Sequence, residues 1–418
     1  MNQQSAAMPN EKIKTPAYAW VVLVATYLAS LAAPLNLFKV PPMLTTLQPI
    51  FNLSQSEQGQ LMSVFSIMGF VLAIPAGFIL KRFGIKLTVL GAVAALAIGA
   101  GLGALSETWM LLFFGRFIEG AGMGLIMVSA PLAISLWFPA DKRGLPMGLW
   151  ASCIGVGNTA MFILAPKIAA PSAGDPSQVY QWPNVWWTGA IFAAISFVIF
   201  AIFFRLPKAE EMADPPAPVA PGSAPEAPPS LVKAMANRNL WLLSIAFLTF
   251  NLVIMALNTF FPVYLEVVRG YTKEGASSTS SLLMFIAIFS APLGSFLSDK
   301  LKSRKLVIVI PFVIIAGMFF CPFSIEGAGM IQFYLIVMGI MMGPVAPIIL
   351  AAVPETMPSP QTIGIGMGVA ALGQNLGMYI GPVLFGYLLE SVSWQTTGYV
   401  MIPICLIGII AALMAKVR

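Results

Sequence analysis

Three charged residues of this 418-residue chain lie within long stretches of apolar sequence: Lys39, Arg116 and Glu119. A carboxyl group can take up and release a proton, and an ammonium or guanidinium group can pair with a carboxylate or attract an anion. Arg116 and Glu119 are three residues apart, so on a helix their side chains share one face and can form an ion pair. These residue types therefore predict proton transfer or anion binding inside an apolar part of the protein.

Glu119 is the only acidic residue expected deep inside an apolar stretch, because the other 15 lie at the ends of such stretches or between them. The chain contains no histidine, which excludes histidine metal sites, Ser-His-Asp triads and imidazole proton relays. Two interpretations of Arg116 and Glu119 stay open: a permanent ion pair that holds helices together, and a carboxyl that carries a proton. Lys39 also has two, since its side chain could extend to the aqueous interface or face the protein interior.

The composition shows which kind of protein contains these residues. Apolar residues make up 58% of the chain and charged residues only 9%, whereas soluble globular proteins are about 25% charged. This excludes a nucleic-acid-binding protein, a soluble enzyme and a disordered chain. The three cysteines are far apart in apolar runs and indicate no disulfide framework, and we expect no metal and no cofactor.

The elements that must position the charged residues are membrane helices, which need about 20 mostly apolar residues each. Twelve such runs occur, at about 18–40, 58–80, 87–105, 109–135, 145–167, 186–204, 240–266, 277–298, 306–324, 330–352, 362–388 and 394–415. A proline-rich stretch at 215–230 predicts a linker between the sixth and seventh runs. We expect an all-α membrane protein with an N-terminal tail (1–17), a six-helix half (18–205), a linker (206–239) and a second six-helix half (240–418).

Basic residues orient these spans. Of the 22 Lys and Arg, 17 fall in tails and loops on one side of the predicted membrane and three on the other. Because cytoplasmic loops are rich in Lys and Arg, both termini are expected in the cytoplasm. The N-terminal residues are too polar for a cleavable signal peptide, so the first run is expected to remain as a membrane anchor. Ser54 and Glu57 have the spacing of a capping box, which predicts the start of the second helix.

The two halves repeat each other at an offset of about 220 residues. Leu35-Asn36-Leu37-Phe38 corresponds to Leu257-Asn258-Thr259-Phe260, and Gly120 and Gly124 correspond to Gly339 and Gly343. Each half has an even number of spans, so the two copies have the same orientation and form a parallel repeat. Substrate sites in such folds lie near the membrane midplane, between the halves.

Three motifs resemble those of the major facilitator superfamily, and the resemblance covers essentially the whole chain. The loop after the second span matches the family pattern Gly-x-x-x-Asp-Arg-x-Gly-x-Lys with Gly77, Arg82, Gly84 and Lys86, but Lys81 replaces the aspartate. The corresponding loop of the second half keeps an acid, Asp299. Further matches are Arg116, Gly120 and Gly122 in the fourth span and Trp137 to Gly144 after it. The resemblance implies a secondary transporter that alternates access between the two membrane faces, with no enzymatic activity.

The resemblance also implies site residues. Spans 1 and 7 line the central space in this family, so Asn36 and Asn258 are expected to face each other. The expected substrate-binding residues are Asn36, Lys39, Arg116, Asn158, Asn251, Asn258, Gln374, Asn375 and Tyr379, with Glu119 coupling a proton. The expected gating residues are Gly77, Lys81, Arg82, Gly84, Lys86, Asp141, Arg143, Asp299, Arg304 and Glu355. Within that gate, Lys81 is expected to pair with Glu355 and Arg82 with Asp141.

The polar residues of the predicted spans favour an anionic solute, because Arg116 and Lys39 outnumber Glu119. We expect a monomeric carrier in the lipid bilayer of a cell (inner) membrane, moving a small organic or inorganic anion by proton symport or exchange. The alternative is proton-coupled efflux of hydrophobic or cationic drugs, although the first span offers a cation where such exporters need acids. Gly155-Val156-Gly157-Asn158 resembles the signature of nitrate and nitrite porters, but spans 2 and 8 lack the arginines that hold the anion there.

Overall fold

The computed structural model describes residues 15–73, 75–139, 142–171, 179–208, 211, 235–358 and 362–417. The regular structure of these residues is helical. The α-helices are α1 (Ala17–Phe38), α2 (Leu44–Phe51), α3 (Gln55–Leu72), α4 (Pro75–Ala104), α5 (Trp109–Trp137), α6 (Gly144–Ala151), α7 (Cys153–Ala169), α8 (Pro183–Phe203), α10 (Arg238–Val267), α11 (Lys273–Leu301), α12 (Arg304–Met318), α13 (Ala328–Thr356), α14 (Ile363–Leu389) and α15 (Trp394–Met414). A short 3-10 helix, η1 (Pro41–Met43), joins α1 to α2.

Ten helical stretches in the described residues are long and apolar enough to cross a membrane. The span predicted at 58–80 is divided, because α3 ends at Leu72 and α4 starts at Pro75. Gly84 then interrupts α4 with a φ of 74°, a conformation that costs little without a Cβ. The first part of α4 thus continues the crossing that α3 begins, and the rest of α4 forms the next one.

Two other predicted spans have different ends from those expected. The span predicted at 306–324 is too long, because α12 stops at Met318 after 15 residues, which rise only about 22 Å. The first span is longer than predicted and reaches Phe51. It is broken after Phe38, since Pro41 and Pro42 have no N–H to continue the helix. The predicted capping box at Ser54 and Glu57 is present at the start of α3.

Two hydrophobic cores lie in the protein. One consists almost entirely of side chains from α1 to α8, and the other of side chains from α10 to α15. Between the two groups, α3 packs against α14 and α7 packs against α11. Gly59 of α3 makes the first contact possible, because a Cβ there would come within 2.2 Å of the Pro382 carbonyl oxygen in α14.

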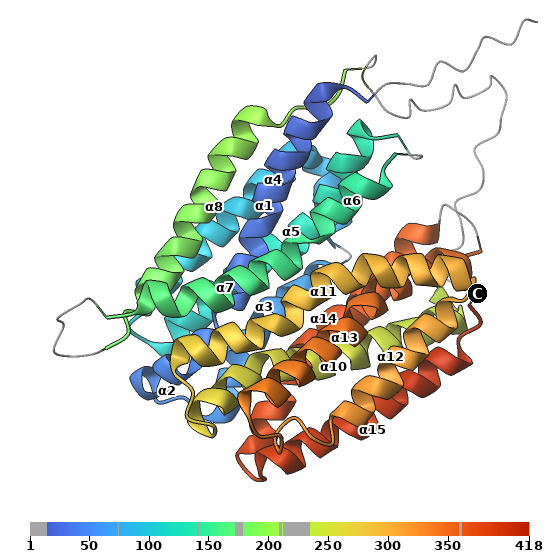
Figure 1. Cartoon of the computed structure of the whole chain (residues 1–418). Helices are drawn as coiled ribbons and strands as arrows, with labels where there is room; N and C mark the ends of the chain where they lie inside the picture. The colour runs from blue at the N-terminus through green and yellow to red at the C-terminus, as the bar shows by residue number, and fades with distance from the viewer. Residues whose placement is uncertain are drawn as a thin grey trace, which may run out of the picture.

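The two helix groups do not run parallel to each other. We call the end of the bundle where α1 begins and α15 ends the terminal face, and the end where α2 lies the opposite face (Figure 1). The ribbons of the two groups approach each other at the opposite face and diverge toward the terminal face (Figure 1). The opposite face is therefore the end at which the two groups are held together.

Candidate functional site

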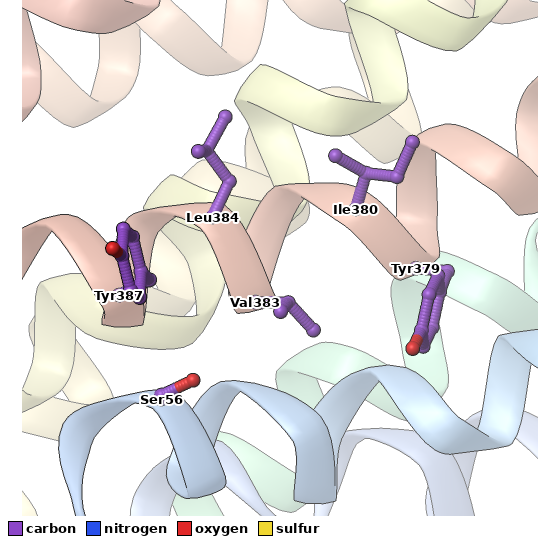
Figure 2. A pocket seen from close by; sticks show the side chains of 6 residues that line it. All are labelled: Ser56, Tyr379, Ile380, Val383, Leu384 and Tyr387. Atoms are coloured by element: carbon purple, nitrogen blue, oxygen red, sulfur yellow. The ribbon is translucent and has the colours of Figure 1, made fainter.

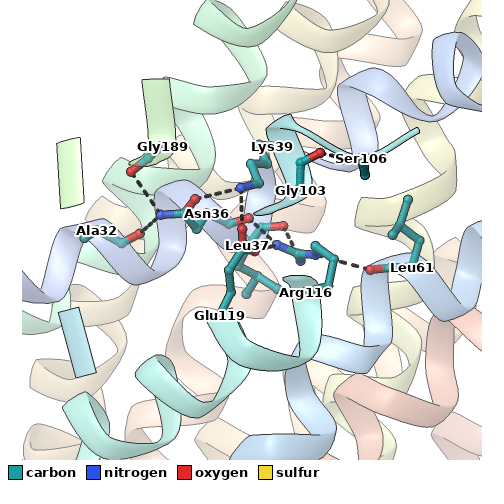
Figure 3. A network of polar contacts seen from close by, with 10 residues as sticks. All are labelled: Ala32, Asn36, Leu37, Lys39, Leu61, Gly103, Ser106, Arg116, Glu119 and Gly189. Atoms are coloured by element: carbon teal, nitrogen blue, oxygen red, sulfur yellow. Dashed lines mark hydrogen bonds and ion pairs between the residues drawn. The ribbon is translucent and has the colours of Figure 1, made fainter. Parts of the chain in front are cut away.

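Lys39, Arg116 and Glu119 form one buried charged cluster between the end of α1 and the middle of α5 (Figure 3). The Lys39 Nζ atom lies 2.6 Å from Oε1 of Glu119, and the Arg116 Nη1 atom lies 2.5 Å from Oε2. All three side chains are 0% exposed. The structure thus brings together the three charged residues that the sequence placed in apolar stretches, and it places Lys39 in the interior.

Arg116 also binds the broken end of α1. Its Nη1 atom donates to the Asn36 carbonyl oxygen at 2.6 Å and its Nη2 atom to the Leu37 carbonyl oxygen at 3.3 Å. The last carbonyls of a helix have no partner within that helix, and Pro41 has no N–H to reach Leu37. The guanidinium replaces the missing donors, and its positive charge favours the carboxyl end of the helix dipole. A longer bond of 3.4 Å joins Arg116 Nε to the Leu61 carbonyl oxygen in α3.

The Asn36 side chain belongs to the same cluster. Its Oδ1 atom accepts a hydrogen bond from Lys39 at 2.7 Å. Its Nδ2 atom donates to the carbonyl oxygens of Ala32 in α1, at 2.9 Å, and Gly189 in α8, at 3.4 Å. The expectation that Asn36 faces Asn258 is therefore wrong in this structure, because the Asn36 amide turns toward α8 (Figure 3).

Aromatic rings and a glycine complete the surroundings of the cluster. The Lys39 ammonium lies 4.8 Å from the centre of the Trp186 ring, and the Arg116 guanidinium 4.6 Å from the Phe65 ring, both at cation–π distance. Gly99 of α4 leaves room for Glu119, because a Cβ at Gly99 would lie 2.7 Å from the Glu119 Cγ atom. With both cations and the carboxylate ionised, the cluster has a net charge of +1.

Asn158 and Asn258 form a second polar contact, which joins the two helix groups. Nδ2 of Asn158 in α7 donates to Oδ1 of Asn258 in α10 at 3.3 Å. Both residues are buried, with 0% and 1% exposure. Asn258 thus has a partner in the other helix group. That partner lies in α7, whereas the sequence repeat suggested Asn36 in α1.

The other predicted substrate-binding residues lie outside the charged cluster. Asn251 and Asn375 each donate to a carbonyl of their own helix, at Phe247 and Ala371. Gln374 is half-buried in α14. Tyr379 lines an apolar pocket of about 300 Å³ between α3 and α14 with Ser56, Ile380, Val383, Leu384 and Tyr387 (Figure 2).

The predicted gating residues of the first half lie at the terminal face. Gly84 is the helix break described above, Lys81, Arg82 and Gly77 are exposed, and Lys86 is half-buried. Arg143 donates to the Phe138 and Ser135 carbonyl oxygens at 3.0 and 2.8 Å, so it caps the end of α5. Asp141, the expected partner of Arg82, lies outside the described residues.

The second half of that gate has a different ion pair from the one expected. Arg304 lies 2.8 Å from Asp299 and 3.2 Å from Glu355. The expected pair of Lys81 with Glu355 is wrong in this structure, since Glu355 contacts Arg304 while Lys81 is exposed. All three residues of the observed network lie in the second helix group, at the ends of α11, α12 and α13.

Sequence reasoning missed a set of contacts at the opposite face. Thr45 of α2 donates to Glu266 of α10 at 2.8 Å and accepts a hydrogen bond from Lys273 of α11. Lys273 Nζ also lies 3.0 Å from Glu266. Tyr180 donates to Glu274 at 2.8 Å. The sequence shows only that one short loop is flanked by the charged residues Glu266, Lys273 and Glu274. It does not indicate which residues of the other half they contact.

Tyr180 remains a hydrogen-bond donor over the physiological pH range. Its burial and the neighbouring Glu274 carboxylate raise the pKa of the Tyr180 hydroxyl to about 12. The neutral, donating form is therefore the stable one below that pH. A further bond, from the Ser56 N–H to Glu390 at 2.8 Å, joins α3 to the residue that follows α14. The opposite face is thus closed by polar contacts between the two helix groups.

The fold and motifs define a transporter family. The family model of the Major Facilitator Superfamily matches residues 26–366 and 281–418. The chain therefore belongs to this superfamily, as its motifs indicated, and is a multi-pass membrane transporter and not an enzyme.

Individual relatives agree with this assignment. The chain is 25% identical over 353 residues to the hexuronate transporter of Bacillus subtilis (strain 168), covering 82% of each chain. It is 24% identical over 337 residues to the phosphoglycerate transporter protein of Salmonella typhimurium (strain LT2), covering 74% of this chain and 70% of that protein. A solved structure of a bacterial homologue of the human lysosomal transporter Spinster, inward-facing and unoccupied, matches with a TM-score of 0.79 at 17% identity. The match covers 96% of both chains and shows that the two share a fold.

Proposed function

We propose that the protein moves a small organic or inorganic anion across the cell (inner) membrane by alternating access, coupled to proton symport or to exchange. The cluster of Lys39, Arg116 and Glu119 carries this proposal, because two cations and one carboxylate leave a buried net charge of +1. An uncompensated charge inside a membrane protein is expensive, so it favours a mobile anion as its partner. The hexuronate and phosphoglycerate named for the two relatives are both anions.

The same charge count links the anion to a proton. Protonation of Glu119 raises the cluster from +1 to +2, and a bound monovalent anion returns it to +1. Two unit charges about 6 Å apart interact with about 3 kcal/mol at an effective dielectric constant of 20. Anion and proton each therefore favour the binding of the other by about 100-fold, and this linkage is what symport requires.

The contacts at the opposite face support a proposed outer gate. Thr45, Glu266, Lys273, Tyr180 and Glu274 join the two helix groups there, while the ribbons diverge at the terminal face. The distribution of basic residues predicts that the terminal face is cytoplasmic. We therefore infer an inward-facing state, in which these contacts close the outer side and must break before the protein can open outward.

The test uses the purified protein in proteoliposomes. Counterflow of labelled carboxylates, phosphate esters, inorganic anions and cationic dyes identifies the transported class, and an imposed pH gradient then tests coupling. We expect Glu119→Gln to abolish accumulation driven by the pH gradient and to retain counterflow of the anion. Glu326→Gln, at an exposed carboxylate of the opposite face, is the matched control and should behave like the wild type. Unchanged proton-driven uptake in Glu119→Gln would refute the coupling, and transport of cationic dyes alone would favour the drug-efflux alternative.

A further inference from the structure

The buried amides of Asn158 and Asn258 have two unused hydrogen-bonding atoms. Only Nδ2 of Asn158 and Oδ1 of Asn258 take part in their mutual bond of 3.3 Å. Oδ1 of Asn158, an acceptor, and Nδ2 of Asn258, a donor, have no partner among the described residues. Buried polar groups nearly always have a partner, so an unpaired acceptor and donor on two touching amides indicate a ligand.

The free atoms match the chemistry of a hydroxyl group. One alcohol group can donate its hydrogen to the Asn158 Oδ1 atom and accept a hydrogen bond from the Asn258 Nδ2 atom. A carboxylate or an inorganic anion such as nitrate offers acceptors only, so it would leave the Asn158 Oδ1 atom unpaired. The amide pair therefore favours a hydroxyl over an anionic group.

The amide pair lies next to the segment that carries the charged cluster. Gly157, the neighbour of Asn158, packs on Pro34 of α1, since a Cβ on Gly157 would lie 2.7 Å from that proline ring. Pro34 precedes Asn36 by two residues, about 3 Å along a helix, and Asn36 binds Lys39 and Arg116. The η1 segment, which follows Lys39, packs against both α7 and α10. The amide pair and the charged cluster thus both lie beside the last turns of α1.

We propose that the substrate is a hydroxy-carboxylate, whose hydroxyl binds between Asn158 and Asn258 and whose carboxylate is directed toward the positive cluster. The hydroxyl bonds to the two free atoms while the 3.3 Å bond between the amides is kept, so substrate binding adds a second bridge between α7 and α10. This proposal rests on the proposed transport of an anion and adds the class of anion. A site that hydrogen-bonds a substrate hydroxyl strongly rejects the analogue that lacks it.

The experiment compares acids that differ by their hydroxyl groups. Counterflow of the labelled anion identified by the first test is measured with wild-type protein in proteoliposomes, and unlabelled acids are compared in pairs as inhibitors. The pairs are lactate and propionate, glycerate and propionate, and gluconate and hexanoate. We expect the hydroxylated acid of at least one pair to inhibit at about 10- to 100-fold lower concentration. Asn258→Leu should bring the ratio of the two inhibitory concentrations in that pair close to one, while both acids still inhibit counterflow through their carboxylates.

Two further variants keep the result interpretable. Asn158→Ala tests the same site from the other helix group and should lower the ratio if Asn258→Leu fails to fold. Thr259→Val is the matched control, because Thr259 is equally buried in α10 and its hydroxyl bonds to Met255 of its own helix. It should leave the ratio unchanged.

The outcomes separate this proposal from the proposed function. Equal inhibition by both acids of every pair, in a protein that transports anions, overturns the hydroxyl site alone. An equal fall of the ratio in Thr259→Val also overturns it, because the effect would then belong to α10 as a whole. Absence of any anion transport refutes the proposed function instead.

Discussion

Replacing Glu119 with glutamine leaves Lys39 and Arg116 buried without the carboxylate that they share. The carboxylate oxygens lie 2.6 and 2.5 Å from the two cations, and all three side chains are 0% exposed. Removing one member of a buried ion pair costs about 3–5 kcal/mol. Two cations about 5 Å apart repel each other by about 3 kcal/mol at an effective dielectric constant of 20, which is of the same size. We therefore expect Glu119→Gln to lower the free energy of unfolding by about 3–5 kcal/mol.

A double variant tests whether charge balance is the cause. Glu119→Gln combined with Lys39→Met has a net charge of +1, as the wild type has, and it keeps the bonds of Arg116 to the end of α1. We expect the double variant to regain at least half of the lost stability. The assay is thermal and chemical unfolding in one detergent, with all variants measured side by side. Glu326→Gln removes a carboxylate that is 83% exposed, and should change the free energy of unfolding by less than about 1 kcal/mol.

Two results would refute this reasoning. If Glu119→Gln unfolds at the same temperature as the wild type, the carboxylate does not neutralise the two cations in the folded protein. If the double variant is less stable than Glu119→Gln alone, the loss comes from packing or from single hydrogen bonds, and the net charge is not its cause.

Two further substitutions test the packing around the cluster and the closure of the opposite face. Gly99→Ala brings a Cβ to 2.7 Å from the side chain of Glu119, so we expect a loss of about 1–3 kcal/mol in unfolding experiments. Gly91→Ala, with no neighbouring atom within 4 Å of the new Cβ, should cause no loss and stabilise by up to about 1 kcal/mol, and equal losses in both would show that crowding is not the cause. Lys273→Met removes the hydrogen bond to the other helix group and the ion pair beside it. A cysteine placed at Thr46, which is 9% exposed, should then react faster with a thiol reagent in a protein whose own cysteines are replaced. An unchanged rate would contradict the role of Lys273 in closing this face.

Features that depend on short stretches of sequence were predictable. The capping box at Ser54 and Glu57 starts α3 as expected, because both partners lie within one helical turn. Gly84, recognised in a family motif, occupies the one non-helical position within α4. The superfamily was also recognisable, since its motifs lie in single loops and helices.

Errors arose where helix ends depend on more than apolarity. Residues 319–324 continue the apolar run, yet α12 ends at Met318, since hydropathy does not show where a turn begins. The contacts at the opposite face could not be predicted at all. Thr45 and its partners Glu266 and Lys273 are separated by 221 and 228 residues. Their charges and hydroxyls are ordinary loop features until the helix groups pack together.

The sequence by itself determined that this chain is a membrane transporter and that Arg116 and Glu119 belong to its apolar interior, whereas only the structure placed Lys39 there. Hydropathy and motif spacing are properties of about 20 consecutive residues, and they need no knowledge of packing. Only the tertiary structure decided the partners. It turned Asn36 toward α8, set Arg116 on the carbonyls at the broken end of α1, and joined Asn258 to Asn158 across the two helix groups. These contacts join residues 80 or more positions apart, and their geometry depends on how whole helices pack.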